Sequence, residues 1–191
     1  MKGLRKVMLT LLVVGGVASL AGFGVFSAFS STTTNPGNSF AAGSVNIADN
    51  DAGTALYNVT NKKPGDTATG CIKVTYTGSL PATVKLYRSA FTGGTGLDTY
   101  LDVNVTRGTG TNADCSDFTA AASGSSVYTG TLNAFNTSFA SGISLSNGAG
   151  AGAWGQNDAV TYKFTVSLQD NNSANGLSSG VHSFVWEAHN N

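Results

Sequence analysis

The sequence predicts an all-β fold, a two-sheet antiparallel sandwich of jelly-roll or Greek-key type with about eight or nine strands. The first observation is composition: Gly, Ser, Thr and Asn supply 86 of the 191 residues, and only 10% are charged. Helical bundles and coiled coils need far more Ala, Leu, Glu and Lys. The second is hydrophobic periodicity, which has period two in several segments and never a convincing period of 3.6. The third is the spacing of short apolar segments between polar turns.

The clearest alternation lies in residues 160–168, where Val160, Tyr162, Phe164 and Val166 share one parity with Leu168. Alternate strand residues face opposite sides of a sheet, so this segment buries one face. Residues 72–77 and 101–106 repeat the pattern. Shorter expected strands are residues 44–47, 55–60, 83–87, 127–132 and 181–188.

Turn chemistry separates these segments. Lys63-Pro64-Gly65-Asp66 suits a type II turn, and residues 78–81 and 170–172 also favour turns. Two glycine-rich stretches, residues 93–96 and 141–155, are expected to be surface loops, because glycine has high chain entropy and no side chain to pack.

The chain divides into three expected parts: a signal peptide at 1–28, an N-terminal extension at 29–43 and one sandwich domain at 44–191. Lys2, Arg5 and Lys6 precede an apolar run, and small residues follow it, as in a secretory signal. Cleavage after Ser27 and cleavage after Ala28 both fit, and a membrane anchor is the alternative. Removing residues 1–28 leaves seven basic and ten acidic residues, so the net charge changes from +0 to −3. Neither value suits a dedicated nucleic-acid binder.

Cys71 and Cys115 are the two cysteines of the chain. An even pair in an exported protein usually forms a disulfide. Cys71 has the parity of Lys73 and Thr75, so it is expected to face away from the core. Cys115 lies in a polar loop, and the disulfide is expected to pin that loop onto the sheet.

No motif in the sequence predicts catalysis, a cofactor or a metal. His182 and His189 lie outside any His-Glu-x-x-His motif. On a strand, His182 would share a face with Phe184 and Trp186, while Glu187 and His189 would take the other. We therefore expect no enzyme, no catalytic residue and no metal ligand.

Asp49-Asn50-Asp51 and Asp170-Asn171-Asn172 could offer oxygen ligands to calcium. Neither fits the spacing of a calcium-binding loop. Asp and Asn are favoured in turns for their own backbone hydrogen bonds, which is the preferred interpretation.

Several segments in order resemble one known family. An apolar, Gly-rich export signal runs into Phe26-Ser-Ala-Phe29-Ser-Ser31, followed by Asn38-Ser-Phe40-Ala-Ala-Gly43-Ser-Val45 and Lys63-Pro-Gly-Asp66. Then come Gly78-Ser-Leu-Pro-Ala82-Thr-Val84-Lys-Leu86 and Ser183-Phe-Val-Trp-Glu-Ala188. Together they resemble the TasA/camelysin family of exported proteins, whose signal is removed by a SipW-type peptidase. The cysteine pair departs from its best-known members.

This resemblance implies a secreted or cell-surface jelly-roll subunit of extracellular biofilm-matrix fibres. Its partners would be copies of itself or related matrix subunits, with a signal peptidase during export and membrane contact only through the uncleaved signal. The resemblance places cleavage after Ala28. It also makes residues 29–40 a donor strand that adds to the next subunit, with Phe29, Ser31, Thr33 and Phe40 as its candidate contacts.

An uncharged, β-prone segment is physically suited to complete an exposed sheet edge. Pro36 and Gly37 interrupt it, and a flexible tail is the alternative. From another class, a carbohydrate- or surface-binding module would use exposed rings, for which Trp154, Trp186, Tyr100 and Tyr128 are candidates. Camelysin has also been described as a surface protease, but no metal motif here carries that role over.

Overall fold

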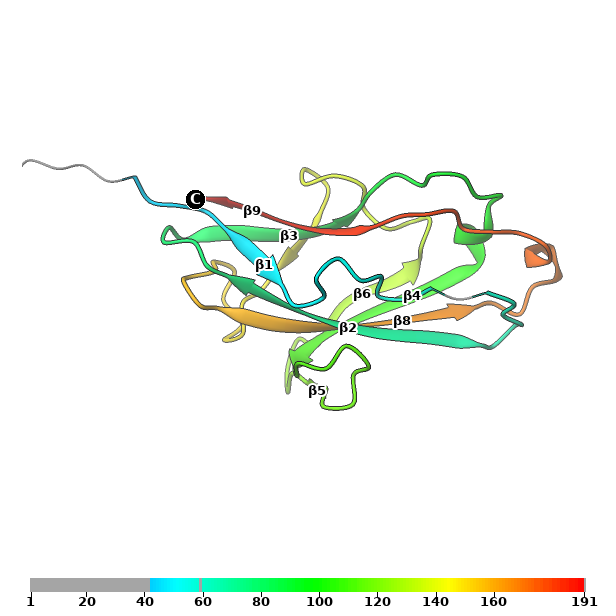
Figure 1. Ribbon diagram of the computed structural model, residues 1–191, viewed down its shortest axis with the longest axis horizontal. Coiled ribbons are helices and arrows are strands. Elements are labelled where there is room, and N and C mark those ends of the chain that lie inside the picture. The colour runs from blue at the N-terminus through cyan, green and yellow to red at the C-terminus, as the bar shows by residue number, and fades with distance from the viewer. Residues whose placement is uncertain (1–41, 59, 191) are drawn as a thin grey trace, which may run out of the picture. The chain divides into compact units, whose positions relative to one another are not determined.

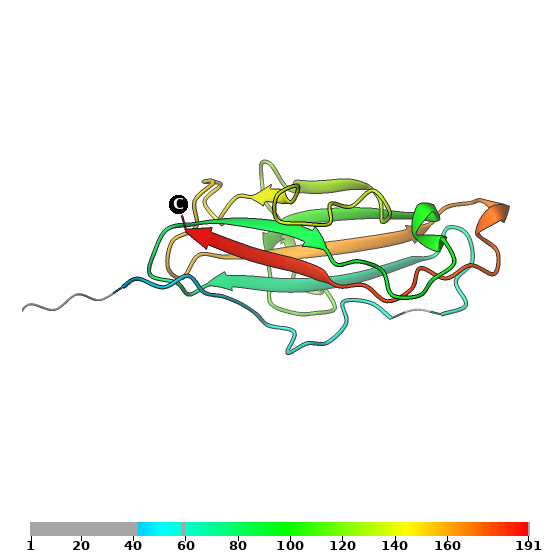
Figure 2. The same cartoon turned by 90° about the horizontal axis from the view of Figure 1, so that it is seen from above.

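The computed structural model describes residues 42–58 and 60–190, which belong to one compact unit. Within them, nine strands form two antiparallel sheets stacked face to face (Figure 1; Figure 2). The larger sheet contains β1 (Ile47–Asp49), β2 (Thr67–Tyr76), β4 (Leu101–Thr109), β5 (Thr119–Ala120), β6 (Ser126–Thr131) and β8 (Ala159–Leu168). The smaller sheet contains β3 (Ala82–Arg88), β7 (Ile143–Leu145) and β9 (Phe184–Asn190). Two 3-10 turns, η1 (Leu97–Tyr100) and η2 (Asn172–Ala174), complete the described elements.

The strand order is β1-β2-β8-β4 in the larger sheet, where β4 continues to both β5 and β6, and β7-β3-β9 in the smaller. The chain crosses between sheets from β2 to β3 and back to β4, then again between β6, β7, β8 and β9. These crossings make a two-sheet sandwich rather than a meander. The predicted fold class is confirmed.

Alternation decides which side chains fill the core. On β2 and β8, Ile72 lies opposite Tyr162 and Val74 opposite Val160, and all four are buried between the sheets. Each such strand therefore contributes every second residue to the core. The largest fully buried side chains come from several strands and two loops: Trp154, Tyr76, Tyr162, Phe135, Phe164, Ile72, Leu86 and Leu132.

One expected strand is wrong. Residues 55–58 and 60 form no strand, although Leu56 and Tyr57 pack against the core. The apolar residues of this segment signal burial, but its backbone finds no ladder partner. Two other expected strands are shifted: β1 begins at Ile47 rather than residue 44, and β9 at Phe184 rather than residue 181.

The glycine-rich stretch 141–155 is also more structured than predicted. It contains β7, and it ends at Trp154, which is 0% exposed. The Trp154 indole N–H donates to the Leu145 carbonyl at 3.0 Å, and its backbone bridges to Ala82. Asn147 adds side-chain bonds to Ala151 and Ala153. The buried Trp154 ring and the Asn147 side-chain amide thus order a segment whose composition predicts a loose loop.

Candidate functional site

The most distinctive feature of the sandwich is the open edge of β9. This strand pairs with β3 on one side, and no other strand of the described residues pairs with it. The Ser89 amide donates to the Ser183 carbonyl at 2.8 Å, which fixes the alternation of the ladder. Odd-numbered residues of β9 therefore bond to β3. Phe184, Trp186 and Ala188 direct their backbone N–H and C=O groups to the open side.

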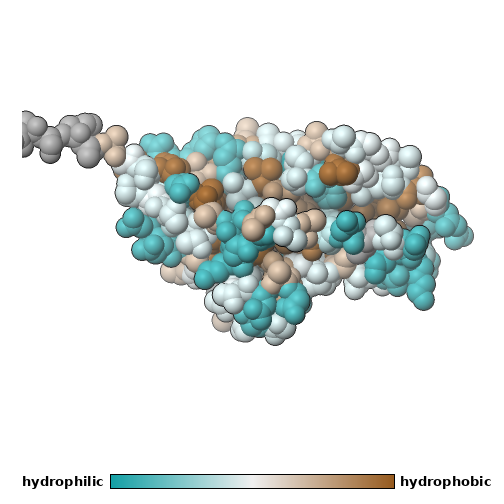
Figure 3. Space-filling model, viewed as in Figure 1, coloured by the Kyte–Doolittle hydropathy of each residue, from teal (hydrophilic) through white to brown (hydrophobic). Residues whose placement is uncertain are grey.

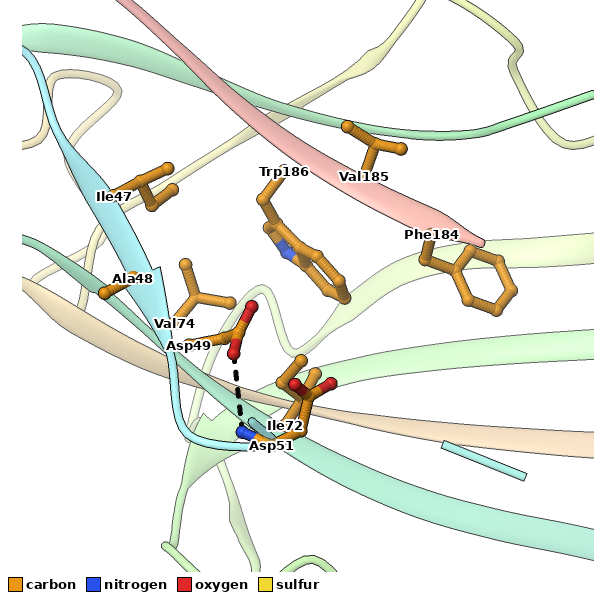
Figure 4. A pocket seen from close by; sticks show the side chains of 9 residues that line it. All are labelled: Ile47, Ala48, Asp49, Asp51, Ile72, Val74, Phe184, Val185 and Trp186. Carbon is orange, nitrogen blue, oxygen red and sulfur yellow. Dashed lines mark hydrogen bonds between the residues drawn. The ribbon is translucent and has the colours of Figure 1, made fainter. Parts of the chain in front are cut away.

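A pocket of about 250 Å³ lies beside this edge. It opens between the β1–β2 end of the larger sheet and β9 of the smaller one, and brown side chains are visible between the two layers in Figure 3. Its floor is apolar, and two carboxylates stand at its β1 side (Figure 4). The lining residues are Ile47, Ala48, Asp49, Asp51, Ile72, Val74, Phe184, Val185 and Trp186.

Trp186 is the central side chain of the pocket. Its ring packs against Tyr162 and Phe164, with centroids 5.8 and 5.9 Å away. Its indole N–H is buried and has no hydrogen-bond partner among the described residues. A buried donor without an acceptor is uncommon and costly.

Asp49 and Asp51 form a turn at the β1 end of the pocket. The Asp51 amide donates to the Asp49 carboxylate at 3.4 Å, and the Gly53 amide donates to Asp51 at 2.8 Å. Partial burial, and then the Asp51 carboxylate, raise the pKa of Asp49 above its usual value. The second acidic candidate is also a turn, since Asn171 caps η2 by accepting from the Ser173 amide. In both segments the side-chain oxygens accept hydrogen bonds from nearby backbone amides, as expected for turns.

The disulfide lies on β2 of the larger sheet. Cys71 and Cys115 are bonded, with Cα atoms 5.2 Å apart. Cys71 alternates with core-facing Ile72 and so faces outward, as predicted, yet it is only 2% exposed. The loop that carries Cys115 covers it, which parity alone does not reveal.

The histidines lie on different faces of the segment before and within β9. His182 contacts the Tyr57 hydroxyl at 2.6 Å, while His189 contacts Glu187 at 2.6 Å on the other face. Burial is the main cause that lowers the pKa of His182, and hydrogen bonds from Tyr87 and His189 lower that of Glu187. In the described ranges no three His, Cys, Asp or Glu side chains converge as metal ligands.

The four aromatic candidates do not form an exposed platform. Trp154 is fully buried, which corrects the expectation that its ring is available. Trp186, Tyr100 and Tyr128 are only partly exposed, and Tyr128 packs on Phe135 at 4.3 Å. Of the four candidate rings, the buried Trp154 is therefore not available to a ligand.

Several sequence-predicted residues lie outside the described part of the chain. These are the cleavage candidates Ser27 and Ala28 and the donor-segment residues Phe29, Ser31, Thr33 and Phe40. Within residues 42–58 and 60–190, no helical segment is long and apolar enough to cross a membrane.

Sequence reasoning placed a strand at β9 but missed the open edge and the pocket. Edge position depends on which strands pair, and pairing is long-range information. Phe184 and Trp186 share one parity, which predicts an apolar face on this strand but not whether another strand pairs with it.

Residues 4–92 match the family model described as camelysin metallo-endopeptidase. The match extends from the basic N-terminal residues through β3 and covers just under half of the chain. A search of curated proteins returned no match.

Proposed function

The chain belongs to the TasA/camelysin family, and on this premise we propose that it is an exported structural subunit of extracellular or cell-surface fibres. Subunits join when the N-terminal segment of one mature copy adds as a strand to β9 of the next. The mature chain then begins near Phe29, after removal of the export signal. The fibre belongs to the biofilm matrix, and the subunit acts outside the cell.

The observation that supports this proposal is the unpaired edge of β9 beside a pocket that has an apolar floor and two carboxylates at its β1 side. An edge strand presents a row of free N–H and C=O groups, which an extended segment of another chain can satisfy. The same segment would set side chains into the pocket, where the Trp186 indole N–H lacks an acceptor. Backbone pairing and side-chain insertion would thus occur together.

The length and chemistry of the N-terminal segment fit this edge. Residues 29–35 precede Pro36 and number seven, as do the residues of β9. At roughly 3.4 Å per residue, each spans about 24 Å. Residues 29–43 contain no charged side chain, so their side chains can enter the pocket without burying a charge, while the α-amino group of the mature chain would stay in water. Phe29 and Phe40 supply large apolar groups.

A deletion tests the donor. Purified mature protein is imaged by negative-stain electron microscopy, beside a variant that lacks residues 29–37. We expect filaments from the full mature chain and folded single particles from the deletion. Filaments that persist in the deletion would exclude this donor, and monodisperse full-length protein at high concentration would exclude self-assembly.

A proline tests the acceptor. Ala188→Pro removes an N–H that makes no bond to β3, so the domain should keep its fold while filament formation is lost. Ala188→Val keeps the N–H with a side chain of similar size and is the matched control. Equal filament yields from both variants would show that the β9 edge is not used.

The matched family's name gives metallo-endopeptidase as a second candidate. The described residues do not fit a catalytic metal, because Glu187 is held by Tyr87 and His189 and no third ligand joins them. Our proposal is a structural protein without enzymatic activity. Chelator-sensitive cleavage of casein by the purified protein would overturn it.

A further inference from the structure

We propose that the disulfide-bonded loop of residues 110–118, here called the cap loop, covers the β2 edge just beyond the end of β1, so that a strand from another copy adds along β9 rather than along this part of β2. The inference deepens the proposed function, on which it rests. The pocket lies between two strand edges, β1–β2 and β9, so a strand entering it has two edges to choose from. The cap loop covers β2 where β1 ends, whereas β9 stays unpaired along its outer side in the described residues.

The β2 edge is closed in three consecutive steps. β1 pairs with Val74–Tyr76, and the Thr77 amide donates to Asn46 at 2.9 Å, so odd-numbered residues of β2 face this side. Beyond the end of β1, the Lys73 amide donates to the Asn50 side-chain oxygen at 2.8 Å. One step further, the Cys71 amide donates to the Ala113 carbonyl of the cap loop at 2.9 Å.

The cap loop and Asn50 also hold each other. The Asn50 side-chain amide donates to the Thr111 carbonyl at 2.9 Å, so one residue bonds both β2 and the loop. On the outer face of the larger sheet, the Thr161 hydroxyl donates to the Gly110 carbonyl at 2.5 Å. Thr161 and Cys71 point outward, yet each is only 2% exposed, because the loop lies over them.

The covalent bond is what makes this cover durable. The loop starts at the end of β4, and β8 lies between β4 and β2, so it must cross β8 to reach this edge (Figure 1). Its residues are largely exposed and polar, and Asp117 organises it by accepting from the Thr111 and Asn112 amides. Such a loop buries little apolar surface and would open readily without a tether. The Cys71–Cys115 bond fixes it at the residue whose amide it covers.

The two edges beside the pocket therefore differ. Natural sheet proteins blunt exposed edges to prevent unwanted pairing. Here one edge is closed by hydrogen bonds and a disulfide, while β9 is left unpaired in the described residues. A strand from a second copy is thereby directed to β9 rather than to β2 beyond the end of β1.

The test uses the full mature chain and two variants. Cys71→Ala/Cys115→Ala removes the tether, and Asn50→Ala removes the acceptor for Lys73 while keeping the disulfide. We expect the Lys73 amide to exchange with deuterium at least about tenfold faster in both variants, with β9 amides unchanged. By electron microscopy, wild-type filaments should be unbranched and of one width, and the variants should give branched or laterally joined ones.

The outcomes separate this inference from the proposed function. Unchanged Lys73 exchange together with unchanged filaments would overturn the cap and leave the fibre subunit standing. Variants that self-associate through β2 while the wild type forms no filament would support the cap and overturn the fibre. Loss of the near-ultraviolet circular dichroism signal would show that the double variant has lost its tertiary packing. In that case the exchange rates and filaments of Asn50→Ala alone test the role of the cap loop.

Discussion

Trp154→Ala should destabilise the domain more than the same change at Trp186. Trp154 is fully buried, its indole donates to Leu145, and its backbone bridges to Ala82. Replacement of a buried Trp by Ala costs about 3–5 kcal/mol, and the Leu145 carbonyl also loses its indole donor. We therefore expect a loss of about 4–5 kcal/mol in the free energy of unfolding, a large fraction of a typical domain's total of roughly 5–15.

The matched control removes the same atoms from a different place. Trp186 is partly exposed at the pocket, and its indole N–H has no partner to lose, so Trp186→Ala should cost about 1–3 kcal/mol. Urea unfolding is followed by near-ultraviolet circular dichroism in chains that lack residues 29–37, because assembly would add apparent stability by mass action. A Trp154→Ala loss no greater than that of Trp186→Ala would refute the role of Trp154 as the anchor of residues 141–155.

Two further perturbations act through other features. Cys71→Ala/Cys115→Ala should lower the free energy of unfolding by about 4 kcal/mol, from the chain entropy of a loop with sequence separation 44; a urea titration that finds a loss below about 1 kcal/mol would contradict this. Burial lowers the pKa of His182 below 6.5, so the unfolded chain takes up this proton more readily than the folded one. Stability should therefore be full above the usual histidine range and fall as pH drops below it, and urea midpoints at about pH 7.5 and 5.5 should converge in His182→Phe.

The sequence predicts those parts of the fold in which local pattern and tertiary structure agree. The alternation in β2, β4 and β8 is long and regular, and each of these strands is paired on both sides. Periodicity then reports burial correctly, because one face meets the core and the other meets water. The outward position of Cys71 follows from the same rule.

The wrong predictions occur where long-range contacts decide. Leu56 and Tyr57 are packed against the core by a segment that has no neighbouring strand, so burial there does not imply a ladder. Arg88, for which the sequence pattern makes no prediction, takes a core-facing position of β3 and is 6% exposed; its guanidinium donates to the carbonyls of Leu132, Ser89 and Asn133. Those acceptors are supplied largely by residues more than forty positions away, so local sequence cannot foretell them.

The candidate site could be anticipated only in part for the same reason. Residues 29–40 attract attention by composition, since they are uncharged and rich in Ser and Thr. The acceptor edge of β9 has no signature in amino-acid composition, because a strand edge is open only when no other strand pairs with it. It becomes visible only when the order β7-β3-β9 is known.

In the proposed fibre, long-range electrostatic forces contribute little to the choice of the strand edge at which subunits join. With residues 1–28 removed, as proposed, the chain would have a net charge of −3 and would repel its copies weakly, and at physiological salt charges are screened beyond about 8 Å. Encounters between subunits are therefore hardly steered, and the outcome depends on short-range pairing worth about 0.5–1.5 kcal/mol per hydrogen bond. Since any open edge offers similar backbone bonds, covering part of the β2 edge removes one competing site beside the pocket. The disulfide and the cap loop act at that point, on the edge that shares the pocket with β9.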